Sequence, residues 1–357
     1  MKRVVILCVW LFSVVAGHAQ LSLDECRRLA RENYPEIRQY DLVHQTEQYN
    51  LSNAARAWIP QIAFSAQATW QTDAPNFPKE LTGMLAQQGL EIPGLRKDQY
   101  KVALELNQTI WDGGKSVADK RIARAEAAEQ KTMTDVDLYE LEGRVDDLYF
   151  GILLLDERIA QTNLTLNLLR SNLEKVRALQ RNGVAMQSDA DVLEAELLSV
   201  GQQLIQFESS CDSYRRMLGI FIGQKVGDRK LQRPSAVQPL SGESARPELA
   251  MFAAKIDRLT AQEKMVKSSS MPRLGFFAQG YYGYPGLDYM QSMMNSDWSW
   301  NAMLGVKLSW NFGAYYTQKN NLNKLRISRQ QVEVQRDVFL FNMNLQAAQE
   351  NGDIARL

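Results

Sequence analysis

The chain has 357 residues, of which 45% are hydrophobic and 23% are charged, and its 41 basic residues balance its 41 acidic residues. This balance offers no basic patch of the kind that nucleic-acid binding requires, so we expect no nucleic-acid partner. With only two histidines, the chain also lacks the parts for a catalytic triad or a histidine-based metal site, and we expect no catalytic, cofactor-binding or metal-ligating residues.

Residues 1–19 are predicted to be a secretory signal peptide. Lys2 and Arg3 form its charged start, an apolar run follows, and small residues precede Gln20. The apolar run is shorter than the about 20 residues that a transmembrane helix needs. No later apolar run is long enough, so the exported chain either stays free in solution or spans a membrane as strands.

Residues 20–58 are predicted to be helical, with an interruption at Pro35. In residues 59–113 the period changes to two, because apolar and polar side chains alternate on both sides of a segment rich in Pro, Gly and Asn. We interpret this stretch as two strands joined by a long loop from Asp73 to Pro93. The second strand closes at Trp111, Asp112, Gly113 and Gly114, a sequence typical of a turn from strand to helix.

Residues 114–222 are predicted to form two long helices folded back on each other. Apolar residues recur at steps of three and four along both arms, and this period of 3.5 is typical of helices that lie along other helices. Gly183 is the predicted C-terminal cap of the outgoing arm, and the residues up to Asp189 offer an N-cap for the returning arm. At about 1.5 Å per residue, the outgoing arm would be roughly 100 Å long.

After a link at residues 223–246 the pattern starts again. Residues 247–271 are predicted to be a helix, residues 272–312 a second strand pair, and residues 313–357 the start of a second long helix. Pro35 and Pro60 are 25 residues apart, as are Pro247 and Pro272, which supports an internal repeat. A second hairpin turn at the same spacing from Gly313 would lie beyond Leu357. We therefore expect a C-terminally truncated sequence; the alternative is a natural protein that lacks half of its second hairpin.

The four strands match the period of a membrane β-barrel, in which one face meets lipid and the other lines the lumen. Four strands cannot close a barrel alone, so several copies must share one; a soluble antiparallel sheet is the alternative. The side chains expected to face the lumen are Gln67, Lys101, Glu105, Asn107, Gln279 and Lys307. Since this set carries both signs of charge, it predicts a water-filled passage without selection for one sign of ion.

Three features together resemble TolC-type outer-membrane efflux proteins: the duplicated Pro-containing segments, the strand-to-helix turn after Trp111, and the turn from Asn182 to Leu193. The resemblance covers nearly everything after the signal peptide. It implies an α+β membrane protein, in which a homotrimer shares a transmembrane β-barrel in the lipid of the outer membrane and continues as a barrel of long α-helical coiled-coil hairpins across the periplasm. It further implies a periplasmic adaptor (membrane fusion) protein and an inner-membrane pump as partners.

The resemblance also assigns roles to particular residues. The turn that would dock the adaptor comprises Asn182, Gly183, Val184, Ala185, Ser188, Asp189 and Asp191. The strand-to-helix turns comprise Trp111, Asp112, Gly113, Gly114 and Gly313. The second turn lacks the Asp-Gly-Gly form, and no gate residues can be assigned in a second hairpin. The sequence thus favours an outer-membrane exit duct for efflux or secretion that conducts cargo passively; the alternative is a soluble periplasmic coiled-coil adaptor or scaffold protein.

Overall fold

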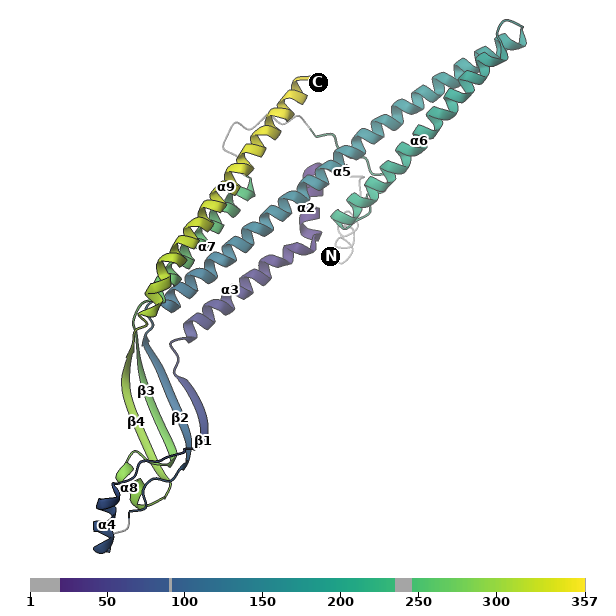
Figure 1. Cartoon of the computed structure of the whole chain (residues 1–357). Coiled ribbons are helices and arrows are strands. Elements are labelled where there is room, and N and C mark those ends of the chain that lie inside the picture. The colour runs from purple at the N-terminus through teal and green to yellow at the C-terminus, as the bar shows by residue number, and fades with distance from the viewer. Residues whose placement is uncertain (1–19, 90–91, 235–245, 357) are drawn as a thin grey trace, which may run out of the picture. The chain divides into compact units, whose positions relative to one another are not determined.

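Helices and strands follow one another twice in the same order: a helical segment, a pair of strands and a long helix (Figure 1). The computed structural model describes residues 20–89, 92–234 and 246–356, and the predicted signal peptide lies outside these ranges. The elements in chain order are α2 (Leu23–Asn33), the 3-10 helix η1 (Pro35–Arg38), α3 (Gln39–Arg56), β1 (Gln61–Trp70), α4 (Lys79–Gln87), β2 (Asp98–Trp111), α5 (Lys115–Arg181), α6 (Gln187–Ile222), α7 (Pro247–Ser268), β3 (Arg273–Tyr284), α8 (Tyr289–Met294), β4 (Ser299–Ser309) and α9 (Gly313–Arg356).

The four strands form one antiparallel sheet in the order β1-β2-β3-β4. The two halves of the repeat meet at the β2–β3 pair, where Glu105 lies opposite Gln279. Throughout the ladder, even-numbered residues pair with even-numbered residues, so they share one face of the sheet, and odd-numbered residues share the other. A bulge between Thr109 and Trp111 breaks this rule once and brings Trp111 opposite Leu274.

The even-numbered face is apolar and uncovered within this chain. Phe64 and Leu304 are 72% and 75% exposed. Apolar side chains of a strand that packs on its own core would have a much lower exposed fraction. Aromatic rings gather near both ends of the strands: Tyr282 lies 5.0 Å from Trp300 at one end, and Trp310 lies 4.8 Å from Phe312 at the other, measured between ring centroids. Aromatic belts of this kind are typical of membrane–water interfaces.

The chain divides into two units, residues 1–42 with 131–251 and residues 43–130 with 252–357. In the first unit, α2 packs on the long hairpin of α5 and α6 over a core of fully buried side chains. Leu141, Val145 and Ile152 carry the apolar seam of α5, and Cys26 and Ala30 are the buried residues of α2. Arg27 closes the contact from outside, because its guanidinium donates to Asp146 at 2.7 and 2.5 Å.

The start of the described chain is bonded into this same core. The hydroxyl of Tyr149 lies 2.7 Å from the carbonyl oxygens of both Leu21 and Gln232, and Leu21 forms a parallel bridge with Leu231. The amide of Asn33 donates to the carbonyls of Ile220 and Phe221 and so satisfies the last turn of α6. These polar contacts join α2, α5 and the segment after α6.

In the second unit, α7 and α9 are in contact through Phe252 and Phe339, whose ring centroids lie 5.9 Å apart. Arg258 of α7 forms an ion pair with Glu129 in the first part of α5. Most of the α9 surface stays open, and none of its described residues is buried. Among the helices that the structure describes, none is both long and apolar enough to cross a bilayer.

The predicted interruption at Pro35 is confirmed, because Pro35 starts a short 3-10 helix after the extended residue Tyr34 and so separates α2 from α3. The structure differs from the sequence-based expectation in two places. The expected loop from Asp73 to Pro93 contains α4, whose Lys, Glu, Leu, Met, Ala and Gln residues favour a helix after Pro78. The loop of the second strand pair contains α8, which Asp288 caps by accepting from the N–H of Gln291.

Candidate functional site

The odd-numbered face of the sheet carries most of its polar side chains. The register places all six predicted polar positions on this face: Gln67, Lys101, Glu105, Asn107, Gln279 and Lys307. Gln67 lies opposite Lys101, and Glu105 lies opposite Gln279. Alternation along four strands therefore sorts the sheet into one polar and one apolar surface.

Three of these side chains form a hydrogen-bonded chain across β2 and β3. Lys101 Nζ donates to Gln279 Oε1 at 3.1 Å, and Gln279 Nε2 donates to Glu105 Oε1 at 2.5 Å. Lys101 Nζ also lies 4.5 Å from the centre of the Tyr281 ring, within the range of a cation–π contact. One glutamine thus connects a cation to an anion that are four positions apart on the same strand.

The polar face holds more cations than anions. Its charged strand residues are Lys101, Glu105, Arg273 and Lys307, so three positive charges face one negative charge. The set predicted from the sequence omitted Arg273, although its position in phase with Gly275 and Phe277 could have revealed it. We therefore describe this face as net cationic.

The turn from β2 to α5 is built around the buried carboxylate of Asp112. One oxygen accepts from the N–H of Gly114 at 2.9 Å, and the other accepts from the N–H of Ser116 at 2.6 Å and from the Ser116 hydroxyl. Burial alone would raise the pKa of Asp112, but the bonds from Ser116 and Gly114 outweigh it and hold this pKa below its ordinary value. Asp112 therefore caps the start of a 67-residue helix in its charged form.

Both glycines of this turn adopt the left-handed conformation, with φ of +71° at Gly113 and +85° at Gly114. A Cβ at Gly113 would lie 2.7 Å from Cβ of Met271, so this position excludes a side chain for two separate reasons.

The corresponding turn of the second repeat uses a different backbone. Asn311 Oδ1 accepts from the N–H of Gly313 at 3.1 Å, as Asp112 does for Gly114. Phe312 stands where Gly113 stands in the first repeat, and among the described residues no non-glycine residue has a positive φ. The missing Asp-Gly-Gly form is thus replaced by an Asn-capped turn that accepts a bulky side chain. Trp310 Nε1 fixes this turn by donating to the carbonyl of Ser270 at 3.0 Å.

The tip of the α5–α6 hairpin is a helix end with two specific backbone bonds. The N–H of Val184 donates to the carbonyl of Leu179, and the N–H of Gly183 donates to that of Gln180, both at 2.9 Å. With φ of +73° at Gly183, these bonds define a Schellman motif. Helix α6 then begins after Met186, whose N–H donates to the carboxylate of Asp189 at 3.0 Å.

The tip displays apolar side chains that are not covered within the chain. Val184 and Met186 are 73% and 74% exposed, and Val192, five residues after the start of α6, is also exposed. The carboxylate of Asp191, which is also exposed, accepts from Gln187 Nε2 at 2.8 Å. The predicted docking set contained Val184 but neither Met186 nor Val192; their apolar character next to the Gly turn was the available signal.

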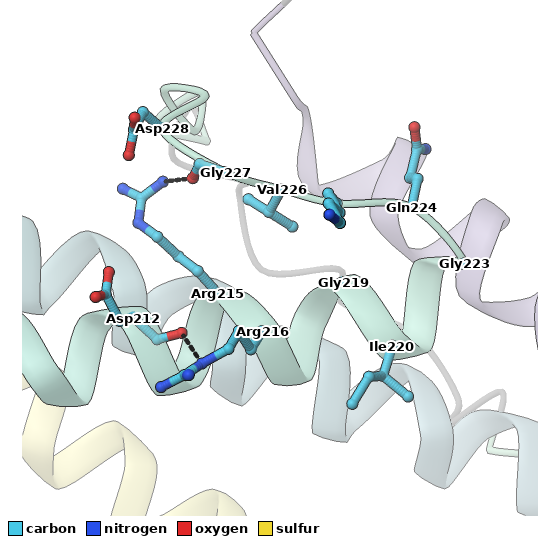
Figure 2. A pocket seen from close by; sticks show the side chains of 11 residues that line it. Asp212, Arg215, Arg216, Gly219, Ile220, Gly223, Gln224, Val226, Gly227 and Asp228 are labelled. Carbon is cyan, nitrogen blue, oxygen red and sulfur yellow. Dashed lines mark hydrogen bonds between the residues drawn. The ribbon is translucent and has the colours of Figure 1, made fainter.

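A cavity of about 530 Å³ lies where α6 ends and the next segment, Gly223 to Asp228, turns back over it (Figure 2). Arg215 bounds it and donates to the carbonyls of Gly227 and Arg229 at 2.9 and 3.0 Å. The same guanidinium binds Asp156 of α5 at 2.8 Å. This arginine therefore joins both arms of the hairpin to the following segment, which suits a structural role.

Comparison with known proteins gives the fold a family. The family model for outer membrane efflux proteins matches residues 27–223, more than half of the chain. Among solved structures, the outer membrane protein VceC from Vibrio cholerae is 14% identical with a TM-score of 0.64, and the match covers 90% of this chain and 75% of VceC. The outer-membrane channel OprN is 13% identical with a TM-score of 0.64, covering 89% of this chain and 71% of OprN.

The Campylobacter jejuni CmeC outer membrane channel is 14% identical with a TM-score of 0.61, and the match covers 90% of this chain and 68% of CmeC. A search of curated protein sequences finds no match. At these identities the solved structures establish the fold, and the family model establishes the family. The resemblance to TolC-type efflux proteins is confirmed, and the alternative of a soluble adaptor is not supported. The chain belongs to the outer membrane efflux protein family, is located in the outer membrane with an extension into the periplasm, and shares the fold of the outer-membrane channels OprN and CmeC.

Proposed function

We propose that this protein is the passive exit duct of a multi-component export system. Three copies join their sheets into a closed ring of strands, the polar face lines a water-filled passage, and the long hairpins continue the passage through the periplasm. A periplasmic adaptor docks at the hairpin tip, and an inner-membrane pump supplies the energy. The duct itself conducts efflux or secretion cargo and catalyses nothing.

The observation that carries this proposal is the separation of the two faces of the sheet. An apolar face that stays open along β1 and β4 requires lipid, and a polar face with charged side chains requires water. The sheet also has two unpaired edges, β1 and β4, which neighbouring copies can pair and thereby remove. Since small closed rings need about eight strands, one sheet of four cannot enclose a passage alone.

Cysteine labelling of membrane vesicles tests the arrangement. We expect a water-soluble maleimide to modify Gln67→Cys on the polar face and to leave Phe64→Cys on the apolar face unmodified until the protein is denatured. The native thiols give little background, because burial raises the pKa of Cys26 to about 12 and also raises the pKa of Cys211. Equal labelling of both positions by the soluble reagent would contradict a lipid-facing surface. Native mass spectrometry of the purified complex measures the number of copies directly.

A photo-crosslinking amino acid tests the docking part of the proposal. We expect a crosslink to the adaptor from position Val184 at the tip and none from Leu164, which is similarly exposed at 71% but lies 17 residues before the end of α5. Adaptor crosslinks from Leu164 alone would move the docking surface away from the tip. The predicted docking residues Asn182, Gly183, Ala185, Ser188, Asp189 and Asp191 would then act only in shaping the turn.

A further inference from the structure

We propose that the polar face of the sheet, where it meets the first turn of α5, binds anions that carry an apolar or aromatic group. The site rests on the proposed function, because anionic cargo would meet it only if this face lines the passage. Its parts are a cavity, two cations that form no ion pair with the residues that the structure describes, and an aromatic ring, and they come from the sheet and the start of α5.

The cavity has a volume of about 380 Å³, which is enough for a molecule of one or two aromatic rings. Most of the strand residues that line it are odd-numbered, including Asn107, Arg273, Phe277 and Lys307. Lys115 and Ser116 of α5 also line it, as do the even-numbered Gln108, Leu274 and Phe276. Both surfaces belong to the second structural unit, so the cavity lies within one body of the protein.

Arg273 and Lys307 are close neighbours on this face. Arg273 pairs with Ser309 and Gly275 pairs with Lys307, so the two cationic residues are diagonal neighbours at about 7–8 Å between backbones. Neither side chain has an ion pair with any residue in the described part of the chain. Two adjacent unpaired cations create a positive potential that an anion would relieve.

The two carboxylates in the cavity wall already have hydrogen-bond partners. Asp112 accepts three hydrogen bonds from Gly114 and Ser116, and Asp119 accepts from Lys115 Nζ at 2.7 Å. Neither one forms an ion pair with Arg273 or Lys307, and the cavity wall carries three cations (Lys115, Arg273 and Lys307) against two anions (Asp112 and Asp119). A second copy would bring β1 beside β4, and the odd-numbered residues of β1 are Gln, Ala, Ser, Gln and Thr, which carry no carboxylate.

The apolar part of the site is the ring of Phe277. A Cβ added to Gly305 would lie 2.9 Å from this ring, so the ring rests against the bare backbone of β4. Gly275, between Arg273 and Phe277 on the same face, adds no side chain to fill the space. An aromatic face next to two cations matches an anionic aromatic or amphiphilic molecule better than a small inorganic anion.

Calorimetric titration of the full chain in neutral detergent tests the site, with naphthalene disulfonate as the probe. We expect Arg273→Gln and Lys307→Gln each to weaken binding about tenfold, since each removes a hydrogen bond to a charged group. The matched control is Lys101→Gln, which removes the same charge from the same face at a residue already bonded to Gln279. It should leave the affinity within about twofold.

Two further probes define the chemical class. A naphthalene derivative bearing a trimethylammonium group should not bind, and inorganic sulfate should bind at least about tenfold more weakly than the disulfonate if Phe277 contributes. Sulfate binding as strongly as the disulfonate would overturn the aromatic part of the proposal. Unchanged disulfonate affinity in both variants, or no binding at all to the wild type, would overturn the site.

Conductance in planar bilayers separates this inference from the proposed function. If the wild-type protein conducts ions and the disulfonate blocks the current less in Arg273→Gln than in Lys101→Gln, the result supports both the proposed duct and the anion-binding site. A channel that conducts but neither binds the disulfonate in calorimetry nor is blocked by it contradicts the inference alone. A protein that binds the disulfonate but conducts nothing contradicts the duct and leaves the binding site established by calorimetry.

Discussion

The N–H of Ser116 donates to a carboxylate oxygen of Asp112 at 2.6 Å, across the junction between the last residue of β2 and the first turn of α5. The carboxylate is buried and its other oxygen is bonded as well. One charged side chain therefore satisfies the backbone N–H groups at the start of α5, beside the end of β2.

We expect Asp112→Ala to lower the free energy of unfolding by about 1–2 kcal/mol, the usual cost of a lost helix cap. Because the pKa of Asp112 is lower in the folded than in the unfolded chain, its contribution is present above the unfolded pKa and is lost as the pH falls through the folded pKa. Thermal unfolding in detergent, followed by circular dichroism between neutral and acid pH, measures this. Asp257→Asn, on an exposed part of α7, is the control and should show the wild-type pH dependence.

Tyr149→Phe tests the contact between the start of the described chain and the core. The change leaves the carbonyls of Leu21 and Gln232 without their buried donor, so we expect a loss of about 1–2 kcal/mol. Burial raises the pKa of Tyr149 from 10.0 to about 12, so the wild type loses stability as the pH rises through this window. The variant should lose less over the same range. Tyr139→Phe, at a more exposed tyrosine, is the control. In urea unfolding it should show the same loss of stability as the wild type when the pH rises through this window.

Much of this fold follows from the two periods in the sequence. The period of 3.5 in the hairpin buries Leu141, Val145 and Ile152, and the period of two in the strands gives the faces seen in the register. The duplication indicated by the proline pairs predicts that both halves supply strands to one sheet. The elements that were missed, α4 and α8, are short helices inside connections, where local propensity competes with Pro and Gly and no period is long enough to detect.

Less of the candidate site could be predicted from the sequence. Alternation predicted Lys101, Glu105 and Gln279 on one face, but their hydrogen-bonded chain depends on the β2–β3 register, which joins residues more than 170 positions apart. The cavity near Arg273 depends on the same long-range pairing and on the start of α5. Local patterns place residues on faces, and only strand pairing places them next to one another.

Gly183→Val should impair export while leaving insertion into the outer membrane intact. A Cβ at this position meets nothing within 4 Å, so the cost comes from the positive φ alone and is about 1–2 kcal/mol at the tip. Gly201→Val makes the same chemical change in α6 without a positive φ and serves as the control. Cellular resistance to an exported toxic compound reports export, and membrane fractionation reports insertion. Normal export by the Gly183 variant would show that adaptor docking does not depend on the geometry of this turn.

Glu105→Gln should make the channel more selective for anions. The polar face carries three cations and one anion, and the change removes its only negative charge while keeping an acceptor for Gln279. The reversal potential under a salt gradient in planar bilayers measures the selectivity. Lys101→Gln should shift the reversal potential in the opposite direction, and the two shifts should shrink together at high salt. A shift of the same sign in both variants would show that neither charge acts on passing ions.

The two strand-to-helix turns place different limits on change in the two halves of the chain. The turn after β2 needs two left-handed glycines and leaves no room for a side chain against Met271, whereas the turn after β4 accommodates Phe312 on an ordinary backbone. An exchange of the two segments is therefore one-directional: Asp-Gly-Gly fits the backbone after β4, but Asn-Phe-Gly would place a phenylalanine in a strained, filled position after β2. The duplicated halves have ceased to be interchangeable at the point where each strand pair passes into its helix, and variation can accumulate there in only one of them.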